Sequence, residues 1–194
     1  MRTVFVDVDT QFDFLFPAGA LYVPGAERII PAVGQLNRHA EAHGIPLLST
    51  ADAHAENDPE FATWPPHCIA GTLGQRKPAA TLLEKRAVIP NWDANTAFDS
   101  ASQYIIEKQT IDLFETKTVR RVLDSLGAEC FVVYGVVTEI CVISAVRGLL
   151  TPGKQVLVVA DAIQALSAEK AAQAFEEIRS LGGAVVALGE ILAP

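Results

Sequence analysis

The chain has few of the features that mark secreted, membrane-embedded or nucleic-acid-binding proteins. It contains three cysteines, and Cys68, Cys130 and Cys141 show no close pairing, so we expect reduced thiols and a cytoplasmic location. The first residues, MRTVFVDVD, lack the apolar stretch of a signal peptide, and no window approaches the length of a transmembrane helix, so no membrane partner is expected. A net charge of −8 argues against nucleic acid as a partner, because phosphate binding needs a basic surface.

The length and composition are those of a folded domain. The 194 residues suffice to bury a substantial core, and half of them are apolar while a fifth are charged. No internal repeat, low-complexity tract or linker divides the chain. We therefore expect a single domain over residues 1–194.

Apolar runs alternate with helical patterns along the chain, which predicts strands separated by helices. The strands are expected at 3–8, 46–50, 103–107, 130–135, 155–160 and 184–188. The helices are expected at 29–43, 119–126 and 142–149, and from about 167 onward. This alternation predicts a three-layer α/β/α fold around a six-stranded, mainly parallel sheet. The stretch 52–90 is richer in Pro, Gly and polar residues, which predicts a long, partly irregular excursion from the sheet. Long loops inside compact domains tend to be functional.

Ligands of open parallel sheets bind beyond the carboxyl ends of the strands, so the residues that follow each strand are candidates for a site. These residues are Asp9, Asp52 with His54, Lys108, Cys141 and Asp161.

A thiol, a carboxylate and a lysine among these candidates fit together chemically. Cys141 is expected in the first turn of a helix, where free N–H groups and the helix dipole favour a thiolate. Asp9 could take the proton of the thiol and later return it to a leaving group, while Lys108 would lower the pKa of the thiol. The alternatives are a buried cysteine that only fills space, a solvated lysine, and Asp7, on the same face as Asp9, as the acting carboxylate.

The segment TADAHAENDPEFATWPPHC contains a candidate metal site. Two imidazoles and a carboxylate, His54, His67 and Asp52, form a normal ligand set for a divalent transition metal, with zinc favoured and iron or manganese as alternatives. Alternatively, Asp52 and His54 could form hydrogen bonds within a loop, and His67 could be a buried neutral histidine. Possible fourth ligands are Glu56, Asp58 and Glu60. We do not count His39 and His43 as metal ligands, because their position at the C-terminus of a helix is a sufficient electrostatic reason for two histidines there.

These motifs resemble those of the isochorismatase-like cysteine hydrolases and, among them, the nicotinamidase (pyrazinamidase) branch. The matching segments are DTQFDF at 9–14, TADAH at 50–54, WPPHC at 64–68, EKQTIDLF at 107–114 and GVVTEICV at 135–142. They follow one another in the family's order over nearly the whole chain.

The resemblance implies a role for each matching position. Asp9, Lys108 and Cys141 would form the catalytic triad, and a cis bond between Val136 and Val137 would aim the backbone N–H groups of Val137 and Cys141 at the substrate oxygen. The metal would be bound by Asp52, His54 and His67, with Glu60 where many relatives have a third histidine. Phe14 and Trp64 would sandwich an aromatic ring. The implied activity is hydrolysis of a small aromatic carboxamide, nicotinamide, to nicotinate and ammonia through a thioester, in a homo-oligomer.

Three positions depart from the branch pattern: Phe12 replaces a usual asparagine, Gln109 a common glycine and Glu139 a frequent aspartate. Each departure could reshape the pocket. One alternative therefore keeps the triad but changes the substrate to another carboxamide, ureido or carbamoyl compound. The other is a non-catalytic binding protein of the same fold.

Overall fold

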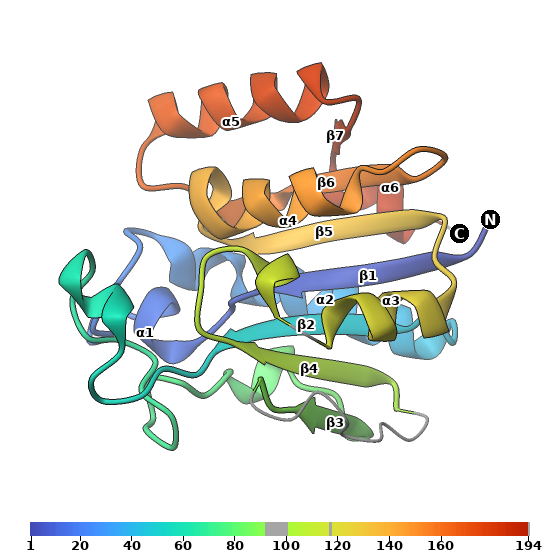
Figure 1. Cartoon of the computed structure of the whole chain (residues 1–194). Helices are drawn as coiled ribbons and strands as arrows, with labels where there is room; N and C mark the ends of the chain where they lie inside the picture. The colour runs from blue at the N-terminus through green and yellow to red at the C-terminus, as the bar shows by residue number, and fades with distance from the viewer. Residues whose placement is uncertain (92–100, 117, 194) are drawn as a thin grey trace.

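The computed structural model describes residues 1–91, 101–116 and 118–193. Its centre is one sheet with the strand order β3-β4-β2-β1-β5-β6-β7, in which neighbouring strands run parallel (Figure 1). The strands are β1 (Thr3–Val8), β2 (Leu47–Asp52), β3 (Arg86–Ile89), β4 (Gln103–Lys108), β5 (Cys130–Val136), β6 (Gln155–Gln164) and β7 (Ala184–Val186). The predicted parallel sheet is confirmed.

The number of strands was wrong by one. The described residues form seven strands rather than six, because β3 lies inside the 52–90 excursion and pairs with β4 from Arg86 opposite Gln103. This strand is a four-residue edge strand, RAVI, with only Ile89 buried, so it has no continuous apolar run to reveal it. The strand β6 also continues to Gln164, past a register shift against β5.

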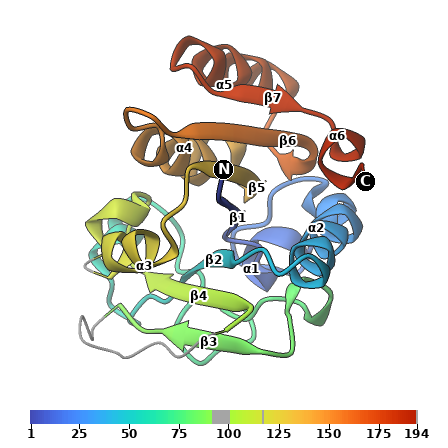
Figure 2. The same ribbon diagram turned by 90° about the vertical axis from the view of Figure 1, so that its right-hand side faces the viewer.

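Helices cover both faces of this sheet. The helices are α1 (Phe12–Leu15), α2 (Ile30–Ala42), α3 (Val119–Leu126), α4 (Ile143–Leu149), α5 (Ala168–Ser180) and α6 (Leu188–Leu192). Figure 2 shows α3 and α4 on one side of the sheet and α1, α2 and α6 on the other, with α5 beside α4. The predicted three-layer α/β/α fold is therefore confirmed. None of the helices in the described part of the chain is long and apolar enough to cross a membrane.

The central strands carry the core because their side chains are apolar on both faces. The side chains of Val4, Phe5, Val6 and Val8 on β1 are at most 2% exposed, and every residue of β5 is buried. Helix ends follow local sequence signals: α3 stops at Gly127, whose φ is +59°, and the Ser167 side chain caps the start of α5.

The parallel register brings four chemically active residues to one edge of the sheet. Asp52 and Lys108 are direct partners at the ends of β2 and β4, and Asp9 follows the end of β1. Cys141 follows β5 in η5 (Thr138–Val142), a single π-helical turn that leads into α4. Such turns are frequent at functional sites.

Candidate active site and metal centre

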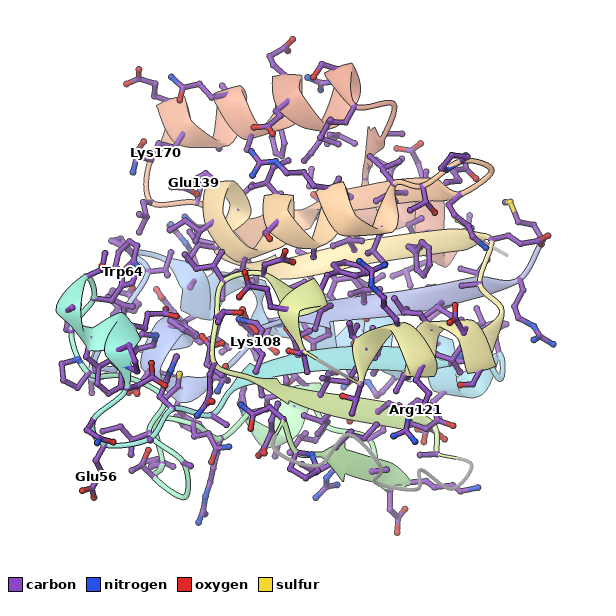
Figure 3. All side chains as sticks on the ribbon, viewed as in Figure 1. Glu56, Trp64, Lys108, Arg121, Glu139 and Lys170 are labelled. Atoms are coloured by element: carbon purple, nitrogen blue, oxygen red, sulfur yellow. The ribbon has the colours of Figure 1, made fainter. Side chains whose placement is uncertain are left out.

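Asp9, Lys108 and Cys141 converge at the carboxyl edge of the sheet. The Nζ atom of Lys108 lies 2.9 Å from Asp9 Oδ2 and 3.9 Å from Cys141 Sγ, and it also contacts Asp52 Oδ1. All of these side chains are buried. Lys108, which is labelled in Figure 3, therefore joins the predicted triad to the predicted metal ligand Asp52.

Thr50 fixes the Asp9 carboxylate. The Thr50 hydroxyl donates to Asp9 Oδ1 at 2.5 Å and accepts from the Asp9 backbone N–H at 3.1 Å. Asp9 itself has a φ of +49°, in the left-handed region that non-glycine residues rarely occupy. These contacts turn the other carboxylate oxygen towards Lys108.

Asp7 belongs to a different network. Its carboxylate accepts hydrogen bonds from Thr10, Ser49 and Lys77, at 2.7, 3.2 and 3.2 Å. These partners occupy Asp7 in a buried cluster of its own, so Asp9 is the carboxylate that faces Lys108.

The pKa shifts of the three groups run in a different direction from the one expected for a thiolate at Cys141. Burial raises the pKa of Cys141 well above its usual value, and the nearby Asp9 and Asp52 charges add to this effect, which outweighs the opposite influence of Lys108. Burial also acts to raise the pKa of Asp9, but Lys108 and the Thr50 hydrogen bond bring it below its usual value. Burial opposes charge on Lys108, yet the two carboxylates raise its pKa. These directions favour a thiol, a carboxylate and an ammonium.

Asp52, His54 and His67 form a second buried cluster, whose ligand atoms lie within 4.8 Å of one another. The Nε2 atoms of His54 and His67 are each 3.9 Å from Asp52 Oδ2. The opposite ring atoms are held from outside: His54 Nδ1 lies 3.1 Å from Asp58 Oδ2, and His67 Nδ1 lies 2.8 Å from the Pro65 carbonyl. Such outer contacts orient imidazoles as metal ligands.

The cluster fits a divalent transition metal. His54 Nε2 is buried without a hydrogen-bond partner among the described residues, which is costly unless a ligand or ion satisfies it. Glu60 lies outside the three-residue cluster but lines the adjoining pocket. Asp58 is occupied by His54 Nδ1, and the exposed Glu56 projects outward, far from Lys108, in Figure 3. Of the three candidate fourth ligands, Glu60 faces the site.

A cavity of about 60 Å³ connects the two clusters. Asp9 and Cys141 lie on its wall together with Asp52 and His67, and Phe14 and Trp64 also face it. The Phe14 ring is 5.4 Å from the His67 ring, centre to centre. Asp161, the remaining strand-end candidate, is elsewhere: its Oδ2 accepts a hydrogen bond from the backbone N–H of Leu188.

Several pocket residues had no sequence signal. These are the apolar wall residues Leu21, Tyr22, Val23, Ile111, Ile140 and Leu166, whereas Val136 and Val137, which complete the wall, were expected from the resemblance. Gln11 and Thr50, which orient other side chains, were also missed as functional candidates, although Gln11 is a fixed position of the D-x-Q-x-D-F motif. The Val136–Val137 peptide bond is cis.

The three departures from the branch pattern have different surroundings. Phe12 stacks on Phe16 at 4.7 Å between ring centres, and Gln109 is exposed. Glu139 accepts a hydrogen bond from the backbone N–H of Leu166, a pocket residue, at 3.1 Å. The third departure, at Glu139, therefore forms a hydrogen bond with a residue of the described pocket wall.

Comparisons with known proteins agree with this architecture. A family model described as Isochorismatase domain matches residues 3–190. A nicotinamidase from Acinetobacter baylyi is 26% identical over 203 aligned residues, which cover 90% of this chain and 87% of the relative. A nicotinamidase/pyrazinamidase from Mycobacterium tuberculosis is 27% identical over 189 residues, covering 93% and 95%. The crystal structure of pyrazinamidase from Pyrococcus horikoshii in complex with zinc superimposes with a TM-score of 0.82 at 28% identity, covering 96% of this chain and 99% of that one.

The chain therefore belongs to the isochorismatase family of hydrolases. The named relatives confirm the resemblance to the nicotinamidase/pyrazinamidase branch.

Proposed function

We propose that the protein hydrolyses nicotinamide to nicotinate and ammonia through a thioester on Cys141. The observation that carries this proposal is the position of Lys108 Nζ, 2.9 Å from Asp9 and 3.9 Å from Cys141, at a pocket that also contains Phe14 and Trp64. The names of the two curated relatives support the choice of substrate.

Asp9 would act as the base and then as the acid. It would accept the proton of Cys141 Sγ as the thiolate attacks the carboxamide carbon, and the backbone N–H groups of Val137 and Cys141 would stabilise the oxyanion. Asp9 would next give its proton to the departing ammonia, leaving a thioester. Water would then attack the thioester with Asp9 accepting one proton, and the released thiolate would recover that proton.

Asp52, His54 and His67 would hold one divalent ion, with Glu60 as the proposed fourth ligand. Zinc is favoured, as in the related zinc-containing crystal structure, and iron or manganese are the alternatives. When bound, the ion would supply a positive centre for the ring nitrogen and so orient the ring. Phe14 and Trp64 would hold the two faces of that ring.

The second candidate is another small carboxamide, ureido or carbamoyl compound. The charged residues on the pocket wall, Asp9, Asp52 and Glu60, are acidic, and no Lys or Arg lines the part of the pocket that the structure describes. The described wall therefore offers no basic side chain to pair with a carboxylate of the substrate. This observation favours a neutral aromatic amide and ranks the second candidate below the first.

Ammonia release from nicotinamide tests the proposal, with zinc supplied and Cys141→Ala as the control. Turnover that disappears in Cys141→Ala supports it, and no release at high enzyme concentration removes nicotinamide. Chelation of the metal separates the candidates, because turnover of a substrate that needs no metal to orient it would survive chelation.

We further propose that residues 1–194 act as one domain in a cytoplasmic homo-oligomer. The family resemblance supports this assembly, and light scattering of the purified protein measures its size. A mass equal to one chain would contradict the oligomer.

A further inference from the structure

A recess lies directly behind one wall of the candidate pocket. It has a volume of about 270 Å³ and lies between the end of β6 and the first turns of α5. Its lining includes Thr138, Ile163, Leu166, Ala168, Ala171 and Phe175. Among the described residues, Leu166 alone lines both this recess and the pocket that contains Cys141. Leu166 therefore lies at the boundary between the two spaces, and we call this boundary residue the partition.

The candidate pocket has a much smaller volume than the neighbouring recess. Its volume of about 60 Å³ compares with about 270 Å³ for the recess, whereas pockets for drug-sized ligands span roughly 300–1,000 Å³. The Leu166 side chain is 37% exposed, so the surrounding core does not enclose it on all sides. A change at this one position can alter the pocket without disturbing the sheet.

Two hydrogen bonds hold the segment around Leu166, the residue that borders both spaces. Glu139 Oε1 accepts the Leu166 N–H at 3.1 Å, and Gln164 Nε2 donates to the Pro24 carbonyl at 3.0 Å. Figure 3 shows Glu139 near the start of α4, beside the connection that leads into α5. The Glu139 side chain, in place of the aspartate expected from the branch pattern, therefore hydrogen-bonds the backbone of the residue at this boundary.

We propose that Leu166, positioned by Glu139, determines how large an aromatic ring the pocket accepts. Shortening Leu166 would join the pocket to the recess and admit a fused second ring. The lining of the recess suits such a group, because Ile163, Ala171 and Phe175 are apolar. The part of this inference that concerns hydrolysis rests on the proposed function.

The first test measures access to Cys141 without requiring hydrolysis. Leu166→Ala is compared with Ile111→Ala, a matched control: Ile111 is also 37% exposed and lines the pocket but not the recess. Cys141 is alkylated with iodoacetamide and with N-(1-naphthyl)iodoacetamide, and its peptide is quantified by mass spectrometry. Because both reagents react with the same thiol, a change in the reactivity of that thiol cancels in the ratio of the two alkylation rates. We expect the bulky-to-small ratio to rise about tenfold in Leu166→Ala, the scale of a lost steric barrier in an apolar pocket.

The second test compares quinoline-3-carboxamide with nicotinamide as substrates. We expect the ratio of their kcat/KM values to rise in Leu166→Ala and, to a smaller extent, in Glu139→Ala. Glu139→Gln keeps an acceptor for the Leu166 N–H and should match the unsubstituted protein. An equal rise in Ile111→Ala, or no rise in Leu166→Ala, would overturn the partition.

The two tests separate failure of the partition from failure of the proposed function. If no carboxamide is hydrolysed but the alkylation ratio shifts in Leu166→Ala alone, the partition stands and the proposed function fails. If nicotinamide is hydrolysed and both ratios stay constant, the proposed function stands and the partition fails.

Discussion

The side-chain amide of Gln11 hydrogen-bonds both backbone groups of Asp52. Its Oε1 accepts the Asp52 N–H at 2.8 Å, and its Nε2 donates to the Asp52 carbonyl, also at 2.8 Å. Gln11 is completely buried and follows Asp9 by two positions. One side chain therefore ties the segment of the proposed base to the backbone of a proposed metal ligand.

Gln11→Leu should weaken metal binding. The substitution leaves two buried backbone groups of Asp52 unpaired and frees the proposed ligand to move, and loss of such an orienting partner typically costs about 10–100-fold in affinity. Competition with a chelator measures the affinity. Gln103→Leu is the control, because Gln103 is equally buried but bonds Ser49, Thr81 and Leu83. Equal losses of metal affinity in the two variants would contradict the specific role of Gln11.

Thr50→Val should move the acid limb of the kcat/KM profile to higher pH. The Thr50 hydroxyl lowers the pKa of Asp9, so its removal raises that pKa, and the base form is lost sooner as the pH falls. Activity on the plateau should fall about tenfold or more, since a hydrogen bond to a charged group contributes about 1.5–3 kcal/mol. Thr81→Val removes another buried hydroxyl, one bonded to Pro78, and should leave the acid limb in place. An unchanged limb in Thr50→Val would refute the role of Thr50.

Cys141 should react as a protonated thiol in the resting protein. Burial raises its pKa well above the usual value, so thiolate forms only as the pH rises. We expect the rate of iodoacetamide alkylation in metal-free protein to increase steadily between about pH 6 and about pH 9 without reaching a plateau. Mass spectrometry of the Cys141 peptide follows the reaction. A plateau that begins below neutral pH would mean that a stable thiolate is present and that Asp9 has no proton to remove.

Trp64→Leu should raise KM for nicotinamide with little change in kcat. An aromatic contact contributes about 0.5–1.5 kcal/mol beyond its area, so a rise of about three- to tenfold is expected. Steady-state kinetics with the metal-loaded protein measure this change. A fall in kcat at constant KM would instead place Trp64 in the chemical step and contradict a ring-binding role.

The sequence predicted the elements whose stability depends on local pattern. β1 and β5 are continuously apolar, and their parallel neighbours follow from the helices between them, so the layers and the edge that carries Asp9, Lys108 and Cys141 could be anticipated. The four-residue β3 could not, because it is an edge strand whose pairing with β4 is set by tertiary contacts.

The missed site features depend on packing that a sequence does not display. Leu166 lies 25 positions after Cys141, and nothing in its neighbourhood marks it as part of the pocket wall. Burial raises the pKa of Cys141, whereas Lys108, whose place at a strand end the sequence indicated, lowers it. Desolvation depends on what covers a residue, which only the folded chain reveals.

The most direct test of the central claim, a thioester on Cys141, is to quench the metal-loaded protein with acid during nicotinamide turnover. The masses of its peptides are then measured by mass spectrometry. We predict a nicotinoyl group on the peptide that contains Cys141, with none on the Cys68 or Cys130 peptides. In Cys141→Ala neither the adduct nor ammonia should form. Ammonia release by Cys141→Ala at the rate of the unsubstituted protein would contradict the account.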